Sequence, residues 1–512
     1  MDFGISPFRT TSFDCSIQQL LSPVPYSRQL PVMVTAVDPM ILNQPLFPTP
    51  TPADVCIKTE DEEHPTEELV STLIPTPLQQ NIICIPSPSE TQYINSQVGN
   101  FPSITIPEPL SAITSSLLEK NPAFPNLFNH FIRYTCRVLV PYDDHNNPFR
   151  TILAQMALHP SAEHLLAALL ASSAAHRAGM KRENPPKYII SSLLQTTLEG
   201  LRKALANPEE ASLDTTLATA IALSSYNIIA SDVQHWRMHL DGAREIILHR
   251  RRMAGDGAVR QESSIRTFLS KWFAYLDVIA GASGLTLKEH NYDSAVKLIE
   301  DVTESPPKES WEPSKFDTFT GFTSRLLPLL LRIGKLAHQK RVAEHVNIDL
   351  TRDPEFAEHV DTLEHDLNTA ELDMIILPDE VVIDATLEKQ LRACNQAFHS
   401  AARLHIQRRL RNMTSDEVRP TVEQVFRAIE QVPVGSGPEI SLLYPLFSAG
   451  VEATGPLREF AQFRMQEMEK IGIGNVQRAK KVMLETWQQS DLNGSMKWED
   501  VMEGMGWDLS LA

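Results

Sequence analysis

Residues 163–178 limit the folds open to this chain more than any other stretch, because most positions there are Leu, Ala or Ser. The leucines recur at three- and four-residue spacing, which predicts an α-helix: Leu165, Leu166, Leu169 and Leu170. A helix that is apolar on all sides has to be buried among other elements. We expect Ser161 to cap its start and Gly179 to end it.

Further segments with helical spacing follow this stretch up to residue 252. Their apolar positions are Ile190, Leu193, Leu194, Leu198, Leu201 and Leu205, then Leu213, Leu217, Ile221 and Ile228, then Val233, Trp236, Leu240, Ala243 and Ile247. The linkers between these segments are short, which favours antiparallel packing of successive helices.

Helical patterns continue to residue 505. They include an acidic, exposed helix expected over Pro354–Leu372 and the longest helix over Asp384–Leu410. Residues 285–318 are polar and are expected to form a long loop, and we find no convincing strand pattern with a period of two. The sequence therefore predicts an all-α domain over residues 119–512, an array of about 12–15 stacked antiparallel helices.

Residues 1–118 differ in kind from the remainder, since they hold 17 of the 36 prolines. They carry 3 Lys or Arg against 12 Asp or Glu, a net charge of −9 out of −18 for the whole chain. Segments interrupted by proline cannot bury enough apolar surface to offset chain entropy, so we expect a disordered acidic arm. It is either an activating segment or a plain spacer. Ile57-Lys58-Thr59-Glu60 has the form of a SUMO acceptor, although an ordinary solvated charge run is the stronger interpretation.

The net charge of −18 has the wrong sign for a chain whose main task is to bind nucleic-acid phosphates. The cysteines lie far apart, which argues against a disulfide scaffold and for a reducing compartment: Cys15, Cys56, Cys84, Cys136 and Cys394. We find neither a signal-peptide pattern nor an apolar run of about 18 residues. We therefore expect a soluble, intracellular protein with no membrane contact.

Several segments, taken in their order, resemble the fungal-specific transcription factor domain of zinc-cluster regulators. They are Asn147-Pro148-Phe149, Leu165–Ala178, Asp232–Trp236, His239–Ala243, Phe268–Gly281, Thr320–Ala337, Leu442–Pro456 and Gly474–Leu509. The resemblance covers roughly 120–512. It implies a helical regulatory domain that binds an effector or a partner and controls transcription in the nucleus.

The zinc cluster that usually opens such proteins, six cysteines in about 30 residues, is absent from this sequence. Cys15, Cys56 and Cys84 are too widely spaced to form it. Either the gene model begins late or this member has lost its DNA-binding module. No DNA-binding residue can therefore be assigned, and contact with promoter DNA is expected to be indirect, through a partner.

No catalytic, cofactor-binding or metal-binding residue is assigned either, and we expect no cofactor and no enzymatic activity. Asp491-Leu-Asn493-Gly begins like a calcium loop, but Met496 and Met502 replace its required Gly and Glu. The histidines that follow a Glu lack metal-ligand spacing and are expected at the surface: His345, His359 and His365. Gly281-Ala-Ser283-Gly284 is not a nucleophile elbow, and Gly472-Ile-Gly474 is not a dinucleotide loop.

Two basic clusters, His249–Arg252 and Arg403–Arg411, have competing interpretations. Each is either a nuclear import signal or phosphate contact, or a solvated face whose Arg stems cover apolar neighbours. In the second cluster, Arg403, Arg408 and Arg409 are expected to point outward. Trp236 and His239 belong to the family-like segments, and we expect both to be packing residues first.

The sequence thus favours a nuclear transcription regulator whose helical domain responds to a small-molecule effector or a partner. Its expected partners are the transcription machinery or another DNA-binding regulator, and a homodimer or a heterodimer both fit. A ligand that favours one packing of the helices would expose or hide the acidic arm. The alternative is a helical scaffold or protein-interaction module outside transcription, since fold alone does not give function.

Overall fold

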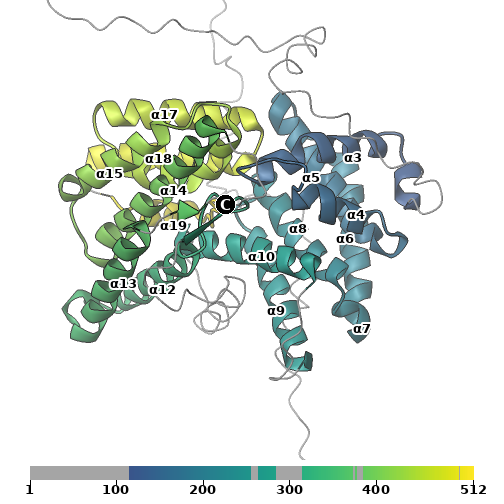
Figure 1. Cartoon of the computed structure of the whole chain (residues 1–512), viewed down its shortest axis with the longest axis horizontal. Coiled ribbons are helices and arrows are strands. Elements are labelled where there is room, and N and C mark those ends of the chain that lie inside the picture. Colours follow the sequence, from purple (N-terminus) through teal and green to yellow (C-terminus); the bar gives the residue numbers. More distant parts are fainter. Residues whose placement is uncertain (1–114, 255–262, 284–313, 373–374, 377–383, 495) are drawn as a thin grey trace, which may run out of the picture. The chain divides into compact units, whose positions relative to one another are not determined.

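The computed structural model describes residues 115–254, 263–283, 314–372, 375–376, 384–494 and 496–512. Most of these residues are helical (Figure 1), which confirms the predicted all-α fold. Nearly all of the predicted acidic arm, with its SUMO-like motif Ile57–Glu60, lies outside the described residues. Ser116–Glu119 forms the 3-10 helix η1, and its Leu117 is buried.

The first group of helices packs around a cluster of buried apolar side chains contributed by residues 117–276, here called the N-terminal core. The group contains α3 (Phe124–Arg133), η2 (Thr135–Leu139), η3 (Phe149–Leu153), α4 (Ala154–Ala157), η4 (Pro160–Ala162), α5 (Glu163–Lys181), α6 (Lys187–Ala206), α7 (Pro208–Ala211), α8 (Asp214–Ile229) and α9 (Trp236–Ala254). Helices α5 and α8 are buried on nearly every face, as their apolar composition predicts.

The second group surrounds a cluster contributed by residues 274–511, here called the C-terminal core. It contains α12 (Leu326–His345), η6 (Leu350–Arg352), α13 (Pro354–Leu372), α14 (Ala385–His405), η7 (Ile406–Leu410), α15 (Ser415–Glu430), η8 (Gly437–Leu442), α16 (Leu443–Val451), α17 (Pro456–Met468), η9 (Glu469–Ile471), α18 (Gly474–Asn493) and α19 (Trp498–Met505). The bounds predicted for α13 are confirmed, although one face of that helix is buried rather than exposed.

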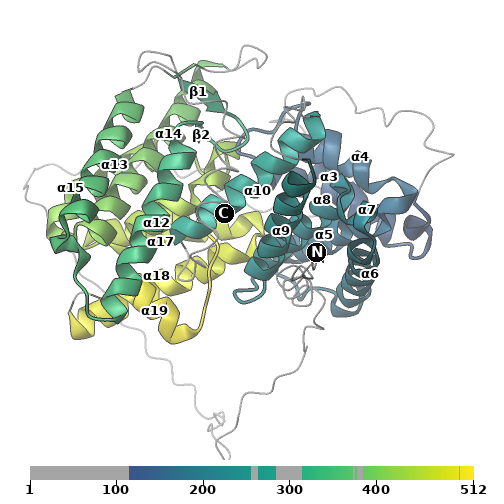
Figure 2. The ribbon, with the colours of Figure 1, turned by 90° about the horizontal axis from the view of Figure 1, so that it is seen from below.

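Helix α10 (Ser264–Ser283) belongs to both cores. Phe268 and Trp272, on its first half, lie in the N-terminal core, whereas Val278 and Ile279 lie in the C-terminal core. Figures 1 and 2 both show α10 running between α12 on one side and α8 and α9 on the other. Its role as an element shared by the two cores follows only from the packing.

Three short strands correct the expectation of no strands. They form a small sheet in the order β2-β1-β3, from Ser314–Asp317 (β1), Phe322–Thr323 (β2) and Ile375–Ile376 (β3). β1 pairs antiparallel with β2 and parallel with β3. Strands of two to four residues are too short to display a period of two, so no alternation marks them in the sequence. The last residues of the predicted loop over 285–318 are thus in a strand.

Both predicted ends of α5 are wrong in detail. Ser161 lies in η4, and α5 starts at Glu163 without a side-chain cap. Gly179 is inside the helix, which ends when Arg182 adopts the left-handed conformation with φ of 54°. Gly179 faces the backbone of Gly472, and a Cβ at this position would overlap the Gly472 carbonyl. A glycine near a helix end can therefore reflect close packing rather than a C-cap.

Candidate functional site

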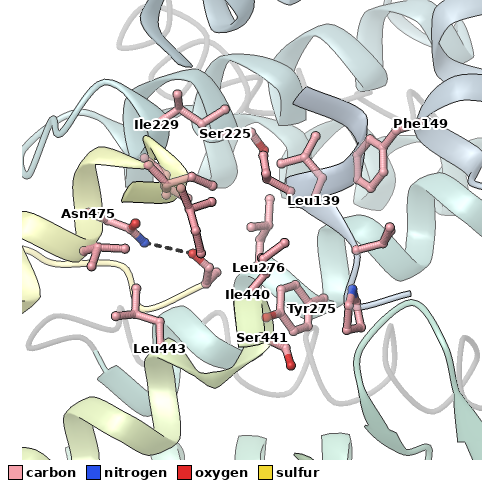
Figure 3. Close-up of a pocket in the computed structure, with 18 of the residues that line it drawn as sticks. Leu139, Phe149, Ser225, Ile229, Tyr275, Leu276, Ile440, Ser441, Leu443 and Asn475 are labelled. Atoms are coloured by element: carbon pink, nitrogen blue, oxygen red, sulfur yellow. Dashed lines mark hydrogen bonds between the residues drawn. The ribbon is translucent and has the colours of Figure 1, made fainter. Parts of the chain in front are cut away.

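An apolar pocket lies where the N-terminal and C-terminal cores meet (Figure 3). Helices α8 and α10 contribute one part of its lining, and η8, η9 and α18 contribute another. The pocket has a volume of about 70 Å³ and is open to solvent on one side. None of its lining side chains is charged. The pocket therefore suits a ligand that contacts both cores.

Aromatic rings make up one side of the pocket. Phe149 from η3 packs edge-on to Trp272 at a centroid distance of 5.0 Å and stacks on Phe319 at 5.8 Å. Tyr275 of α10 meets Phe319 edge-on at 6.3 Å. Burial raises the pKa of Tyr275 well above its usual value of 10, so its hydroxyl stays protonated at neutral pH. This side of the pocket is thus apolar and uncharged.

Two polar side chains of the pocket, Ser225 and Asn475, are more than nine-tenths buried. The amide nitrogen of Asn475 donates hydrogen bonds to the carbonyl oxygens of Ser510 (3.1 Å) and Ala512 (2.9 Å), and Figure 3 marks a bond of this amide. Neither Asn475 Oδ1 nor Ser225 Oγ has a hydrogen-bond partner among the residues that the structure describes. Buried polar atoms are normally paired, so these two oxygens are exceptions in the packing around the pocket.

Residues 507–512, here called the 507–512 segment, close one side of the pocket through Ala512. Trp236 Nε1 donates to the Asp508 carbonyl oxygen at 2.6 Å, and the Arg237 guanidinium binds the Asp508 carboxylate at 2.5 and 2.8 Å. Trp507 lies under the cation of Arg478, 4.9 Å from the ring centroid. The predicted packing role of Trp236 is confirmed, and the structure adds that Trp236 holds this segment.

Glycines let the chain between η9 and α18 lie against the N-terminal group of helices. Gly472 has φ of 91°, and a Cβ there would come within 2.6 Å of the Met180 nitrogen. A Cβ at Gly474 would come within 2.8 Å of the Ile229 carbonyl oxygen. The two pocket residues Ile471 and Ile473 flank Gly472. These glycines thus allow close contact between backbones.

The imidazole ring of His176 in α5 also contacts the chain between η9 and α18. Its Nε2 donates to the Ile471 carbonyl oxygen at 3.0 Å, while Nδ1 lies 3.0 Å from Thr135 Oγ1 and 3.3 Å from His130 Nε2. Burial lowers the pKa of His176 to about 4, so the ring is neutral at pH 7. The same cause lowers the pKa of His239 to about 4, as expected for a packing residue.

A serine and a histidine are also in contact in the C-terminal core, but not as a nucleophile and its base. His405 Nε2 lies 2.8 Å from Ser448 Oγ, which donates its own proton to the Tyr444 carbonyl oxygen at 2.7 Å. The imidazole must therefore donate to Ser448, which is the reverse of base catalysis. Both side chains are buried. This pair is a packing feature.

The basic cluster Arg403–Arg411 is neutralised by acidic partners, which corrects the expectation that Arg408 and Arg409 point outward. Arg408 pairs with Glu452 at 2.7 Å, and Arg409 pairs with Glu499 at 3.0 Å with both side chains less than a tenth exposed. Arg403 pairs with Glu371, and Arg411 pairs with Asp361 and Glu364. In the other cluster, Arg250 pairs with Asp214. Neither cluster presents a set of unpaired cations to phosphates.

The other residues weighed for metal binding have structural surroundings. His345, His359 and His365 are exposed, as predicted. Asp491, from the calcium-like stretch, accepts from Arg458 at 2.6 and 2.8 Å. Within the described ranges, no group of three or more His, Cys, Asp or Glu side chains could hold a metal ion. In the same ranges no helix has the length and apolar character needed to span a bilayer.

Sequence reasoning missed the pocket residues Ser225 and Asn475. Ser225 stands in the run Ser224-Ser225-Tyr226-Asn227 of α8, so its polarity does not single it out in the sequence. Asn475 lies at the start of α18 and shows no signal either.

Comparison with known sequences gives one match. The family model of the fungal specific transcription factor domain matches residues 126–512, which is most of the chain. No curated protein and no solved structure matches.

Proposed function

This chain belongs to the fungal-specific transcription factor domain family, and we propose that it is a nuclear transcription regulator controlled by an effector in the pocket between the two cores. The family is one of transcription regulators, not of enzymes. The observation that supports an effector site here is the lining of the pocket. Helices from both cores contribute to it, namely α8, α10 and α18.

The proposed mechanism is a shift between two packings of the cores. A ligand can move such an equilibrium only by binding one packing more tightly than the other. A ligand in this pocket would touch Ile229 on the N-terminal side and Leu443 on the C-terminal side. The contacts of the ligand therefore depend on how the two cores are placed relative to each other. For this reason the ligand would bind one packing of the cores more tightly than the other.

The acidic residues 1–118 would carry the output to the transcription machinery. Their net charge of −9 and their proline content support this role. The given sequence contains no six-cysteine cluster. The chain would therefore reach promoters through another DNA-binding regulator, in a heterodimer or a larger assembly, or through a DNA-binding module N-terminal to the given sequence. The division into an acidic arm over 1–118 and a regulatory domain over 119–512 is part of this proposal.

Chromatin occupancy tests the regulator function directly. The tagged chain, expressed from Met1, should be enriched at defined promoters in the nucleus, and depletion of its DNA-binding partner should abolish that enrichment. The proposal would be contradicted if the chain showed no enrichment at any promoter and lay in the cytoplasm. That result would favour a helical scaffold outside transcription.

Filling the pocket tests the effector site separately. Ile440→Trp places a large ring into the pocket lining and should fix the transcriptional output of a responsive promoter at one level, whether or not effector is present. The matched control is Ile348→Trp, at an exposed position in the same domain. An Ile440→Trp variant that responds like the control would contradict an effector role for this pocket.

A further inference from the structure

We propose that the surface at the ends of α3 and α5 docks a short acidic peptide segment of a partner protein, one that also carries apolar side chains. This surface is here called the α3–α5 basic surface. It consists of exposed residues in the last turns of the two helices or next to them: Arg133, Tyr134, Arg177, Met180, Lys181 and Arg182. None of these residues lines the pocket, so the proposal does not depend on the effector site.

The ends of α3 and α5 share one region of the molecule because α3 runs beside α5 in the same direction. Lys120, shortly before α3, donates from Nζ to the carboxylate of Glu163 at the start of α5, at 2.7 Å. Near the other ends of the two helices, His130 Nε2 lies 3.3 Å from His176 Nδ1. The two C-terminal ends therefore lie side by side.

The ring of His130 relates the cations of α5 to the end of α3. Its centroid lies 5.1 Å from that of Tyr134, which follows α3. Burial lowers the pKa of His130 to about 4, and the charges of Arg177 and Lys181 act in the same direction. Such an effect requires both cations to be close to the ring. Two cations of α5 and an aromatic ring at the end of α3 are thus near neighbours.

The arginines of this surface differ from the others in having no partner. The side chains of Arg133, Arg177 and Arg182 make no hydrogen bond and no ion pair within the parts of the chain that the structure describes. Every other arginine in those parts has an interaction partner. The arginines without a partner are therefore gathered at one place on the molecule.

The fold itself neutralises little of this charge. Arg177 and Lys181 are four residues apart on α5, where like charges repel and weaken a helix slightly. Each helix C-terminus supplies only about half a negative charge. Glu183, next to Arg182, adds one carboxylate. Four cations thus outweigh their surroundings, and a surface of this kind attracts an anionic partner.

A short acidic peptide fits this surface better than a nucleic acid does. The whole chain has a net charge of −18, and salt screens charges over about 8 Å under physiological conditions. A short peptide stays close to the cations, whereas a duplex extends past them along a molecule with the same sign of charge as its phosphates. Tyr134 and Met180, each 41% exposed, offer apolar contacts to side chains of the peptide.

The experiment measures the fluorescence anisotropy of a labelled peptide titrated with the full chain at pH 7. The probe repeats Glu-Glu-Leu over about twelve residues, which span both helix ends when extended. One control peptide has Gln in place of Glu, and the other has Ser in place of Leu. We expect saturable binding of the probe that weakens at least about tenfold between about 0.05 and 0.5 M salt. The Ser peptide should bind more weakly, and the Gln peptide should not saturate.

Two double variants separate this surface from positive charge in general. Arg133→Gln with Arg177→Gln removes two cations of the α3–α5 basic surface. The matched control is Arg419→Gln with Arg427→Gln, which removes two exposed arginines of α15. All four positions are exposed, so neither double variant should change the urea midpoint. The first should weaken binding of the probe about three- to thirtyfold, whereas the control should leave it unchanged.

Equal affinity of the two double variants, saturable binding of the Gln peptide, or no binding of the probe would each overturn the proposal. Equal binding of the Ser peptide would overturn the apolar part of the peptide class. A DNA duplex of arbitrary sequence that binds more tightly than the probe, and loses affinity in the Arg133 and Arg177 variant, would make the surface a nucleic-acid site instead. Self-association of the chain that this variant abolishes would assign the surface to a second copy.

Discussion

Arg244 is buried together with the acids that neutralise it. Its side chain is 4% exposed and pairs with Asp277, which is 3% exposed, and with Asp241 at 2.5 Å. The neighbouring acids raise the pKa of Arg244 against the effect of burial, so the guanidinium stays charged. A buried ion pair of this kind adds little net stability, but removal of one partner leaves an uncompensated charge.

We therefore expect Arg244→Met to lower the free energy of unfolding by about 3–5 kcal/mol, measured by urea denaturation. Arg419→Met is the control, because Arg419 and Asp416 form a pair that is more than half exposed. That control should change stability by less than about 0.5 kcal/mol. Similar values for both variants would contradict the importance of burial for this pair.

Gly179 tests the contact between α5 and η9. In an open helix Gly→Ala stabilises by up to about 1 kcal/mol, but here the new Cβ meets the Gly472 backbone. We expect Gly179→Ala to destabilise the chain by about 1–3 kcal/mol in urea. Gly504→Ala in α19, where a Cβ meets nothing within 4 Å, should instead stabilise it. A stabilising Gly179→Ala would show that the two backbones do not touch.

His176 makes stability depend on pH. Its pKa is lowered from 6.5 to about 4 by burial, so the unfolded chain takes up this proton before the folded chain does. The contribution of His176 to the free energy of unfolding is complete above pH 6.5. It is lost as the pH falls from 6.5 to about 4, by up to about 3 kcal/mol. His176→Gln, which can still donate to Ile471, should flatten this part of the stability curve. The exposed His359→Gln should leave it unchanged, and an unaltered slope in His176→Gln would contradict the assignment.

At the scale of single elements, the 507–512 segment is held by both apolar packing and hydrogen bonds. Leu509 and Leu511 are buried in the C-terminal core, while Asp508 binds Trp236 and Arg237 of α9 in the N-terminal group. The segment thereby ties α9 to α18 beside the pocket.

Loss of the Asp508 carboxylate should loosen this segment. We expect Asp508→Ala to increase the hydrogen-exchange rate of residues 507–512 about tenfold or more, because Arg237 loses a bidentate partner. The control is Asp500→Ala, which removes a half-exposed carboxylate of α19 that pairs with Arg341 of α12. This variant should leave hydrogen exchange in the 507–512 segment unchanged. Equal hydrogen-exchange rates in both variants would contradict the inference that the Asp508 carboxylate holds the 507–512 segment in place.

At the scale of the whole molecule, α10 should make the two cores unfold together. Its side chains pack in both cores, so neither core is complete without it. Cys136 lies in the N-terminal core and Cys394 in the C-terminal core, and burial raises the pKa of both thiols, so neither reacts while folded.

Labelling of these two thiols along a urea titration, read by peptide mass spectrometry, should give the same midpoint for both. The other three cysteines are replaced by Ser for this measurement. Midpoints that differ by more than about 1 M urea would show two independent domains.

The sequence by itself determined the helical class, most helix positions and the family. These follow from local information, since helical patterns predicted α13 and α14. Asp384 is the N-cap of α14, where its side chain accepts a hydrogen bond from the Leu387 amide. The order of the family-like segments likewise needs no coordinates.

Only the tertiary structure decided the function of residues whose partners are distant in the chain. Gly179 resembles a C-cap until Gly472 is placed against it, and Arg409 resembles a surface residue until Glu499 is found beside it. Ser225 and Asn475 come together in one pocket because α8 and α18 pack at the junction of the two cores. Helical periodicity records which face of a helix is buried, but it does not record which residue lies opposite.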